Sequence, residues 1–442
     1  MNKQTICGDQ HLTIKTTKNK EMKKFLFAAI AVMFCLGLSA QDIKKVRNFF
    51  DKKDWPKAKE SVDLALANEK EQKNWEAWYY KGLIYGQIAK DANLKATVPD
   101  AWMQSFQAYE KAMELDPKQS EVFMMTRQYP VFENYLEIQK EANQSYNSGN
   151  YQAALDGYKN ADKVGRFIYK NKWALSEVDT ILYYYAGAAA MQLENKEEVV
   201  SFFTKICDAN IGGEGYDVCY RYLTFYHSTN KNEELAKKYA DMGRALYPKD
   251  TYYDRVDLDK MRKNDADPVT IFNKYEQIVA IDPKDYDIRY DYAAEIFNWL
   301  YMDSKATPEQ KTIYFEKLIS NLNTAIEIDP KKPEAHLLMG KTHFNEAAFI
   351  QEEIKKIKGS APADVQKRND MKKKMEDRMK EAIAPLDRTN EIYAAMTAEQ
   401  MKDKRTKNEY KSTLYLLTEV HRFLGNKDKE KEYDTKYQAL NQ

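Results

Sequence analysis

One short stretch, residues 142–161, constrains the fold of this chain more than any other. Its sequence, ANQSYNSGNYQAALDGYKNA, has two segments separated by Asn-Ser-Gly-Asn at residues 147–150. Apolar residues recur in the second segment at spacings of three and four, which predicts an amphipathic helix: Tyr151, Ala154, Leu155, Tyr158 and Ala161. Gly149 adopts a positive φ without strain, so it can end the preceding helix. The stretch therefore predicts two short helices joined by a tight turn.

Small residues on both helices, Ala142, Ala154 and Ala161, allow the two helices to pack closely. A single hairpin of this size cannot bury its own apolar face, because part of that face points away from the partner helix. At least about three such hairpins must stack before a stable core exists. The stretch thus predicts further copies of itself along the chain.

The pattern of small and large residues resembles the tetratricopeptide repeat (TPR), a helical hairpin of about 34 residues that a proline closes. The second predicted hairpin matches it most closely, with Trp78, Gly82 and Tyr85 in the first helix and Ser105, Tyr109, Ala112 and Pro117 in the second. The closing proline recurs in register at Pro117, Pro248, Pro283 and Pro330.

The resemblance covers nearly all of residues 41–442 and implies an all-α fold, a TPR-type α-solenoid of about eight or nine helical hairpins. The low content of glycine (15) and proline (12) suits a helical chain. Two insertions, within residues 89–100 and around residues 301–310, separate helices of a hairpin, and we expect the first to form a surface loop. A charged insertion at about residues 352–381 is predicted to project from the array as a helical hairpin near the C-terminus, with Ser360 capping its returning helix.

Residues 1–40 are predicted to be an upstream extension followed by a secretory signal peptide. A pair of lysines precedes an apolar segment at residues 25–38, and Ser39 and Ala40 provide the small residues of a cleavage site. We therefore expect export across the inner membrane and a mature chain that begins near Gln41.

The signal peptide predicts a periplasmic protein, with association with the outer membrane as an open alternative. The apolar segment is too short for a membrane span, and no later span is predicted. Cys35 follows Met33 and Phe34 rather than the small residues of a lipoprotein signal, so we expect no lipid anchor. The Ser-Ala-Gln ending and the Lys-, Tyr- and Asn-rich composition resemble periplasmic proteins of Bacteroidota. Met22 and Met1 are alternative translation starts.

The sequence indicates neither an enzyme nor a nucleic-acid-binding protein. Lys and Arg together number 69 and Asp and Glu 68, so no net field favours nucleic acid. The chain has no P-loop, HExxH, GxSxG or paired CxxC motif, so we expect no catalytic residue and no cofactor. His336 and His343 lie seven residues apart on one predicted helix, about 10.5 Å along its axis. They cannot bind one metal ion together, and we expect them to pack in the core.

The resemblance implies that the first helices of the hairpins line a concave groove for a partner protein or an extended peptide. Amides near the ends of five first helices can donate to and accept from a peptide backbone: Gln87, Asn147, Gln192, Asn298 and Asn345. Aromatic rings on the same helices add apolar contact: Tyr79, Tyr184, Phe225, Tyr290 and Phe344. Asn143 and Arg221 match single residues of the basic and asparagine clamp of chaperone-binding TPR proteins. The alternative for the amides is that they only satisfy backbone groups at helix ends.

These observations predict a non-catalytic, envelope-associated scaffold that binds a partner protein or extended peptide in its groove. The projecting hairpin is a second candidate binding surface. The alternative function is a glycan-binding accessory protein of an outer-membrane uptake system, in which exposed aromatic rings would contact the sugars.

Two cysteines of the predicted mature chain, Cys207 and Cys219, lie on adjacent antiparallel helices, six residues to either side of Gly213. They can therefore face each other at one level, and an oxidising compartment permits a bond between them. The spacing predicts a disulfide. The alternative is a pair of buried thiols that act as small apolar residues.

Overall fold

The computed structural model describes residues 43–126, 130–173, 175–303 and 306–440. The predicted signal peptide lies outside these residues. The described residues are mostly helical and include no strand. The chain divides into two compact units, Met1–Tyr239 and Ala240–Gln442, and the boundary falls inside helix α14 (Glu233–Leu246).

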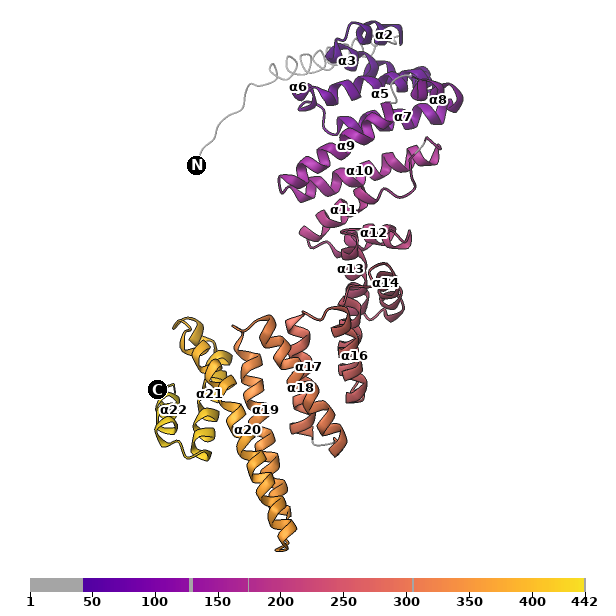
Figure 1. The fold of residues 1–442 in the computed structure, drawn as a ribbon. Helices are drawn as coiled ribbons and strands as arrows, with labels where there is room; N and C mark the ends of the chain where they lie inside the picture. The colour runs from indigo at the N-terminus through magenta and orange to yellow at the C-terminus, as the bar shows by residue number, and fades with distance from the viewer. Residues whose placement is uncertain (1–42, 127–129, 174, 304–305, 441–442) are drawn as a thin grey trace, which may run out of the picture. The chain divides into compact units, whose positions relative to one another are not determined.

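Helices of the first unit pair with their neighbours in chain order (Figure 1). The pairs are α2 (Ile43–Asp51) with α3 (Trp55–Leu66), α5 (Trp75–Lys90) with α7 (Ala101–Leu115), α9 (Pro130–Asn147) with α10 (Tyr151–Lys170), α11 (Thr180–Gln192) with α12 (Lys196–Asp208), and α13 (Asp217–Thr229) with α14. Short helices lie between some of them: α4 (Glu69–Gln72), α6 (Ala92–Lys95) and α8 (Pro117–Thr126).

The second unit continues the same alternation. Its pairs are α15 (Tyr252–Lys263) with α16 (Pro268–Ile281), α17 (Tyr286–Asn298) with α18 (Pro308–Ile328), α19 (Pro333–Lys356) with α20 (Pro362–Ala394), and α21 (Lys404–Phe423) with α22 (Lys427–Ala439). A π-helical turn, η1 (Trp299–Asp303), follows α17, and a 3₁₀ turn, η2 (Gln400–Lys402), precedes α21. The described residues therefore form nine successive helical pairs, which confirms the predicted all-α, TPR-type architecture.

Glycines of the first helices contact large residues of the second helices, as the small-and-large pattern predicts. A Cβ atom at these glycines would overlap the facing side chain in three hairpins: Gly82 with Tyr109, Gly187 with Phe203, and Gly340 with Leu386. The three large side chains are fully or almost fully buried. Glycine is needed here because the two helices approach too closely for a side chain on both.

The turn between the two helices of a hairpin has a repeated local structure. A residue with positive φ ends the first helix, and an Asn or Asp then caps the second helix. Gly149 has φ 79°, and the Asn150 side chain accepts a hydrogen bond from the Ala153 amide. Glu194, with φ 55°, precedes Asn195, which caps α12 in the same way. The caps satisfy amides that have no partner within their own helix.

The insertion within residues 89–100 differs from the expected surface loop. It forms α6 and packs against the array, because Val98 is buried and Lys95 pairs with Glu141 of α9 at 2.5 Å. An apolar side chain and a cross-helix ion pair thus hold the insertion in place.

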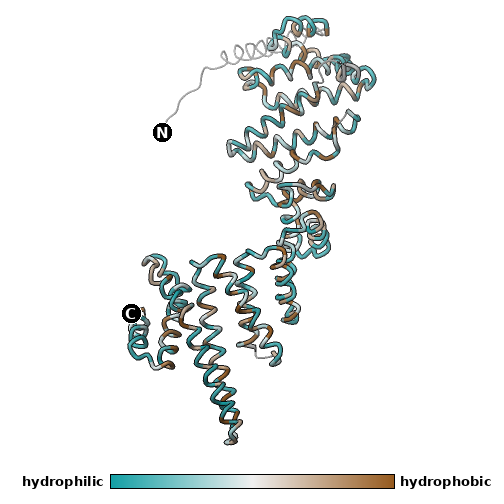
Figure 2. The backbone as a smooth tube through the Cα atoms, in the orientation of Figure 1, coloured by the Kyte–Doolittle hydropathy of each residue, from teal (hydrophilic) through white to brown (hydrophobic). Residues whose placement is uncertain are grey.

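The predicted projecting hairpin is present at the outer halves of α19 and α20, which extend past α17 and α18 (Figure 1). These halves are mostly hydrophilic (Figure 2). Ser360 does not cap α20, whose N-cap residue is Ala361 and has no side-chain capping bond. Arg368 instead closes the tip, donating to the carbonyl oxygens of Ile357 (3.0 Å) and Gly359 (2.5 Å).

Candidate functional site

The predicted groove residues of the first unit differ in their accessibility. Tyr79 is only 2% exposed and packs against Tyr109, so the structure corrects its expected role as a contact surface: it is a core residue. Gln87 on α5 is half-buried. Asn143 and Asn147 of α9 are exposed, and Asn143 accepts a hydrogen bond from the Tyr158 hydroxyl at 2.6 Å.

Three further predicted residues lie on α11 and α13. Tyr184 is half-buried and Gln192 is exposed at the end of α11. Arg221 forms an ion pair with Asp217 of its own helix at 3.2 Å. Phe225 has 62% of its surface exposed. The structure therefore leaves amide and aromatic groups accessible on α9, α11 and α13.

The predicted residues of the second unit are less accessible. Tyr290 is half-buried and stacks on Tyr286, with ring centroids 6.2 Å apart. Asn298 is exposed, and Asn345 is half-buried. Phe344 packs against the core that α19, α20 and α21 share, so it contributes to packing.

The accessible apolar surface of the first unit is concentrated on the first helices. Its exposed large apolar side chains are Leu136, Tyr169, Ile181, Tyr185, Met191, Val218 and Phe225. All but Tyr169 lie on α9, α11 and α13. We call these six residues the apolar stripe. Tyr169 of α10 is the exposed large apolar side chain that a second helix contributes in the described part of the first unit. The stripe therefore belongs to the first helices of the hairpins.

The stripe has a regular place in the repeat. Leu136, Ile181 and Val218 each stand six residues before the small buried residue of their own first helix, namely Ala142, Gly187 and Thr224. Leu136 and Ile181 are 60% and 63% exposed. Sequence reasoning missed these residues, although an apolar side chain at one repeat position in three consecutive hairpins was a readable signal.

Tyrosine rings, including Tyr185 of the stripe, form a chain of contacts from α9 through α11 to the start of α13. Tyr146 contacts Tyr185 with ring centroids 5.5 Å apart, and Tyr185 contacts Tyr184 at 5.6 Å. Tyr184 in turn contacts Tyr216, just before α13, at 5.8 Å. Burial raises the pKa of Tyr146, Tyr184 and Tyr222, so these phenols stay neutral at ordinary pH. The surface is therefore aromatic, uncharged at its rings and fixed by edge-to-face packing.

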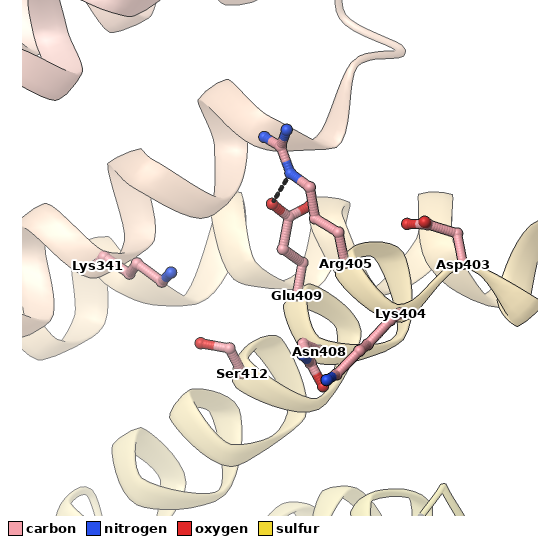
Figure 3. A pocket seen from close by; sticks show the side chains of 7 residues that line it. All are labelled: Lys341, Asp403, Lys404, Arg405, Asn408, Glu409 and Ser412. Carbon is pink, nitrogen blue, oxygen red and sulfur yellow. Dashed lines mark hydrogen bonds and ion pairs between the residues drawn. The ribbon is translucent and has the colours of Figure 1, made fainter.

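A hollow of about 620 Å³ lies between α19 and α21 in the second unit (Figure 3). Lys341 of α19 faces Glu409 and Ser412 of α21 across it (Figure 3). Arg405 pairs with Glu409 at 3.0 Å, and Asp403 caps α21. Among the described residues, no carboxylate pairs with Lys341 or Lys404.

Burial lowers the pKa of Lys341, and the nearby Glu409 carboxylate opposes that effect. The lysine is half-buried, directly follows Gly340 and was not singled out from the sequence. Its cation has no ion-pair partner in the described part of the chain, and the other charged residues that line the hollow are Asp403, Lys404, Arg405 and Glu409.

The histidines lie in packed surroundings. His336 contacts the Pro330 carbonyl oxygen at 3.1 Å, and His343 lies 3.1 Å from a carboxylate oxygen of Glu381. Within the described residues, no three His, Cys, Asp or Glu side chains converge as metal ligands, and no helix is long and apolar enough to cross a bilayer.

Cys207 of α12 and Cys219 of α13 are both buried free thiols in the structure. The disulfide predicted from their spacing is not present there. Burial raises the pKa of the Cys207 thiol above its usual range and that of Cys219 to about 12. Both groups are therefore poorly reactive as nucleophiles in the folded protein.

No protein-family model matches this chain, and no curated protein matches it. Among solved structures, it is similar to YrrB, a TPR protein with an unusual peptide-binding site, at 18% identity over 52% of this chain and 95% of that chain, with a TM-score of 0.30. It is also similar to the TPR2AB domain of yeast Sti1 in complex with pHSP90, at 14% identity over 75% and 99% of the two chains, with a TM-score of 0.24. A third similar structure is the APC/C hetero-tetramer Cut9-Hcn1, at 10% identity over 94% and 72%, with a TM-score of 0.28. Because these identities and TM-scores are low, the assignment of the architecture rests on the helix pairing described above and not on these similarities.

Proposed function

We propose that this chain is a non-catalytic interaction scaffold and that α9, α11 and α13 bind an extended segment of a partner protein. The apolar stripe is the observation that carries the proposal. Large apolar side chains exposed at a repeated position on neighbouring helices favour a binding surface, because exposing them to water is unfavourable. The stripe follows the repeat register, as a surface for an elongated segment requires.

The polar residues near the stripe suit a polypeptide. Asn147 and Gln192 are exposed at the ends of α9 and α11, where their amides can both donate to and accept from a peptide backbone. The packed tyrosines Tyr146, Tyr184 and Tyr185 present their rings with little loss of side-chain entropy on binding. Apolar contact therefore supplies affinity, and the amides add hydrogen bonds with little demand on sequence.

The hollow between α19 and α21 supports a second contact with the partner. Lys341 and Lys404 have no carboxylate partner among the described residues, and Arg405 is already paired with Glu409. We propose that an acidic side chain of the partner enters this hollow. Removing the Lys341 charge, as Lys341→Met, should then weaken the complex and reduce its dependence on salt.

The pull-down that tests the scaffold compares three versions of the chain on native envelope extract. Ile181→Asp with Phe225→Asp places two charges in the stripe, whereas Tyr169→Asp places one on an exposed ring of α10 outside it. We expect proteins enriched by the native chain to be lost with the double variant and retained with Tyr169→Asp. Equal loss with both, or no enrichment by the native chain, would contradict the proposal.

The proposed location is the periplasm or the outer-membrane surface facing it, which makes the partner an envelope protein. This part rests on the lysine pair, the apolar segment and the small residues at the end of residues 1–40. Peptide mapping of protein from native envelopes should find an N-terminus at or near Gln41. A stable N-terminus at Met1 or Met22 would overturn it.

The alternative function, a glycan-binding accessory protein of an outer-membrane uptake system, draws on the same exposed rings of Tyr185 and Phe225. A glycan array separates the two. Saturable sugar binding that Tyr185→Ala abolishes would favour the alternative over the scaffold.

A further inference from the structure

The end of the projecting hairpin carries a strong local charge. Residues 355–373 run from the end of α19 through the turn into α20. They contain six Lys, one Arg and two Asp, a net charge of +5, and we call them the basic tip. The rest of residues 41–442 contains 56 basic and 64 acidic residues, a net charge of −8. The positive charge is therefore local to the tip and is not a property of the whole chain.

Most lysines of the basic tip are not paired with carboxylates. Lys355 and Lys356 each pair, at 2.6 Å, with a glutamate one turn earlier on α19. Asp370 accepts a hydrogen bond from the Gln366 amide at 2.8 Å. Among the described residues, no carboxylate pairs with the other four lysines. These four lysines are all exposed: Lys358, Lys367, Lys372 and Lys373.

The single arginine of the basic tip forms hydrogen bonds within the turn. Arg368 is half-buried and donates to the carbonyl oxygens of Ile357 and Gly359. The accessible cations are therefore lysine ammonium groups, which are compact charges without the planar geometry of a guanidinium. Lys372 and Lys373 are adjacent on one helix, so their side chains point about 100° apart. The accessible charges thus lie on several sides of the hairpin and not on one face.

The basic tip lacks the apolar centre of a protein–protein interface. It has no aromatic residue. Among its residues, all of which the structure describes, Val365 is the large apolar side chain that is exposed, at 41% of its surface. The centre of a protein–protein interface is typically enriched in aromatic residues and depleted of lysine. The tip therefore suits a surface that offers many negative charges and needs no matching apolar pocket.

We propose that the basic tip binds the anionic phospholipid headgroups of a membrane surface. Such a surface presents phosphates at many positions, so lysines on several sides of the hairpin can contact it without a fixed geometry. The hairpin extends past α17 and α18, which leaves its end accessible (Figure 1). The remaining chain has the opposite net charge, so the same surface repels it and favours an approach with the tip first. The inference does not depend on the apolar stripe or on the proposed scaffold function.

Vesicle co-sedimentation with the full chain tests the site. The probes are vesicles of phosphatidylcholine alone and vesicles in which about 30% of the lipid is phosphatidylglycerol. We expect the native chain to bind the anionic vesicles and not the neutral ones, and this binding should weaken between about 50 and 300 mM salt. The affinity should fall by about tenfold or more when the four exposed lysines lose their charge together. The variant carries Lys358→Gln, Lys367→Gln, Lys372→Gln and Lys373→Gln.

The matched control removes the same charge from four exposed lysines elsewhere in the second unit, which have no carboxylate partner among the described residues. It carries Lys249→Gln, Lys284→Gln, Lys331→Gln and Lys427→Gln. Its affinity for the anionic vesicles should stay within about twofold of the native chain, and circular dichroism checks the fold of both variants. Three results would overturn the site: no binding of the native chain to anionic vesicles, equal binding to neutral vesicles, or equal loss in the control. Binding of soluble poly-glutamate without binding of vesicles would also overturn it, in favour of an acidic protein partner.

Discussion

Two glycines one turn apart on α5 test the helix packing most directly. A methyl group at Gly82 would overlap the Tyr109 ring, which is almost fully buried. A methyl group at Gly86 would lie 3.5 Å from the Ser105 hydroxyl, an ordinary contact. Gly82→Ala and Gly86→Ala therefore differ in one respect, the steric overlap, because both replace glycine by alanine inside the same helix.

The expected difference follows from two opposing effects. Replacing glycine by alanine inside a helix stabilises the fold by about 0.5–1 kcal/mol, and this gain applies to both variants. Forcing a methyl group into a packed contact costs about 1–3 kcal/mol, which applies to Gly82→Ala alone. The free energy of unfolding of Gly82→Ala should therefore be about 1–3 kcal/mol lower than that of Gly86→Ala.

Urea unfolding followed by tryptophan fluorescence measures this difference. Five of the six tryptophans, Trp55, Trp75, Trp78, Trp102 and Trp173, lie in the first unit with α5, so the signal mainly reports that unit. With a slope of about 2 kcal/mol per M urea, the two midpoints should lie about 0.5–1.5 M apart. Equal shifts in both variants would refute the close contact and with it the repeat register.

Three further predictions concern other parts of the chain. Burial lowers the pKa of His227, so the unfolded chain binds a proton at this histidine before the folded chain does, and stability present above about pH 6.5 should be lost as the pH falls. The variant His227→Phe should therefore show a smaller drop in the urea midpoint between about pH 7.5 and 5.5. An unchanged drop would contradict this. Cys207 and Cys219 should react slowly with iodoacetamide in the folded chain and yield two labelled thiols after unfolding without reductant, whereas no labelling would reveal a disulfide. Deleting residues 354–368 and joining the ends with a short glycine turn should preserve cooperative unfolding. Deleting residues 351–380 should not, because Met379 is part of the core of the last hairpins. Equal behaviour of the two deletions would show that the projecting hairpin does not stabilise that core.

The candidate sites were only partly readable from the sequence. Amides such as Asn147 and Gln192 were identified because their repeat position places them at exposed helix ends. Tyr79 was misplaced because a tyrosine on a first helix can face either the next helix or solvent. Only the helix positions decide which, and here Tyr109 lies against it. Lys341 was missed because a single lysine carries no signal until α21 is placed opposite it.

The sequence by itself determined the helical character of the chain and the pairing of helices within hairpins, although not the short helix α6 or the start of α20. Spacings of three and four, the small residues Gly82, Gly187 and Gly340, and the capping Asn and Asp residues are local or lie within one hairpin, so they can be read along the chain. The tertiary structure alone decided where the departures from the repeat come together. Residues 301–310 and 352–381 are separate in sequence, but the lengthened α18, α19 and α20 bring Lys311, Phe349 and Lys374 to one cleft. Contacts between hairpins depend on how far each helix extends beyond its neighbour, and no residue pattern within a single repeat encodes that.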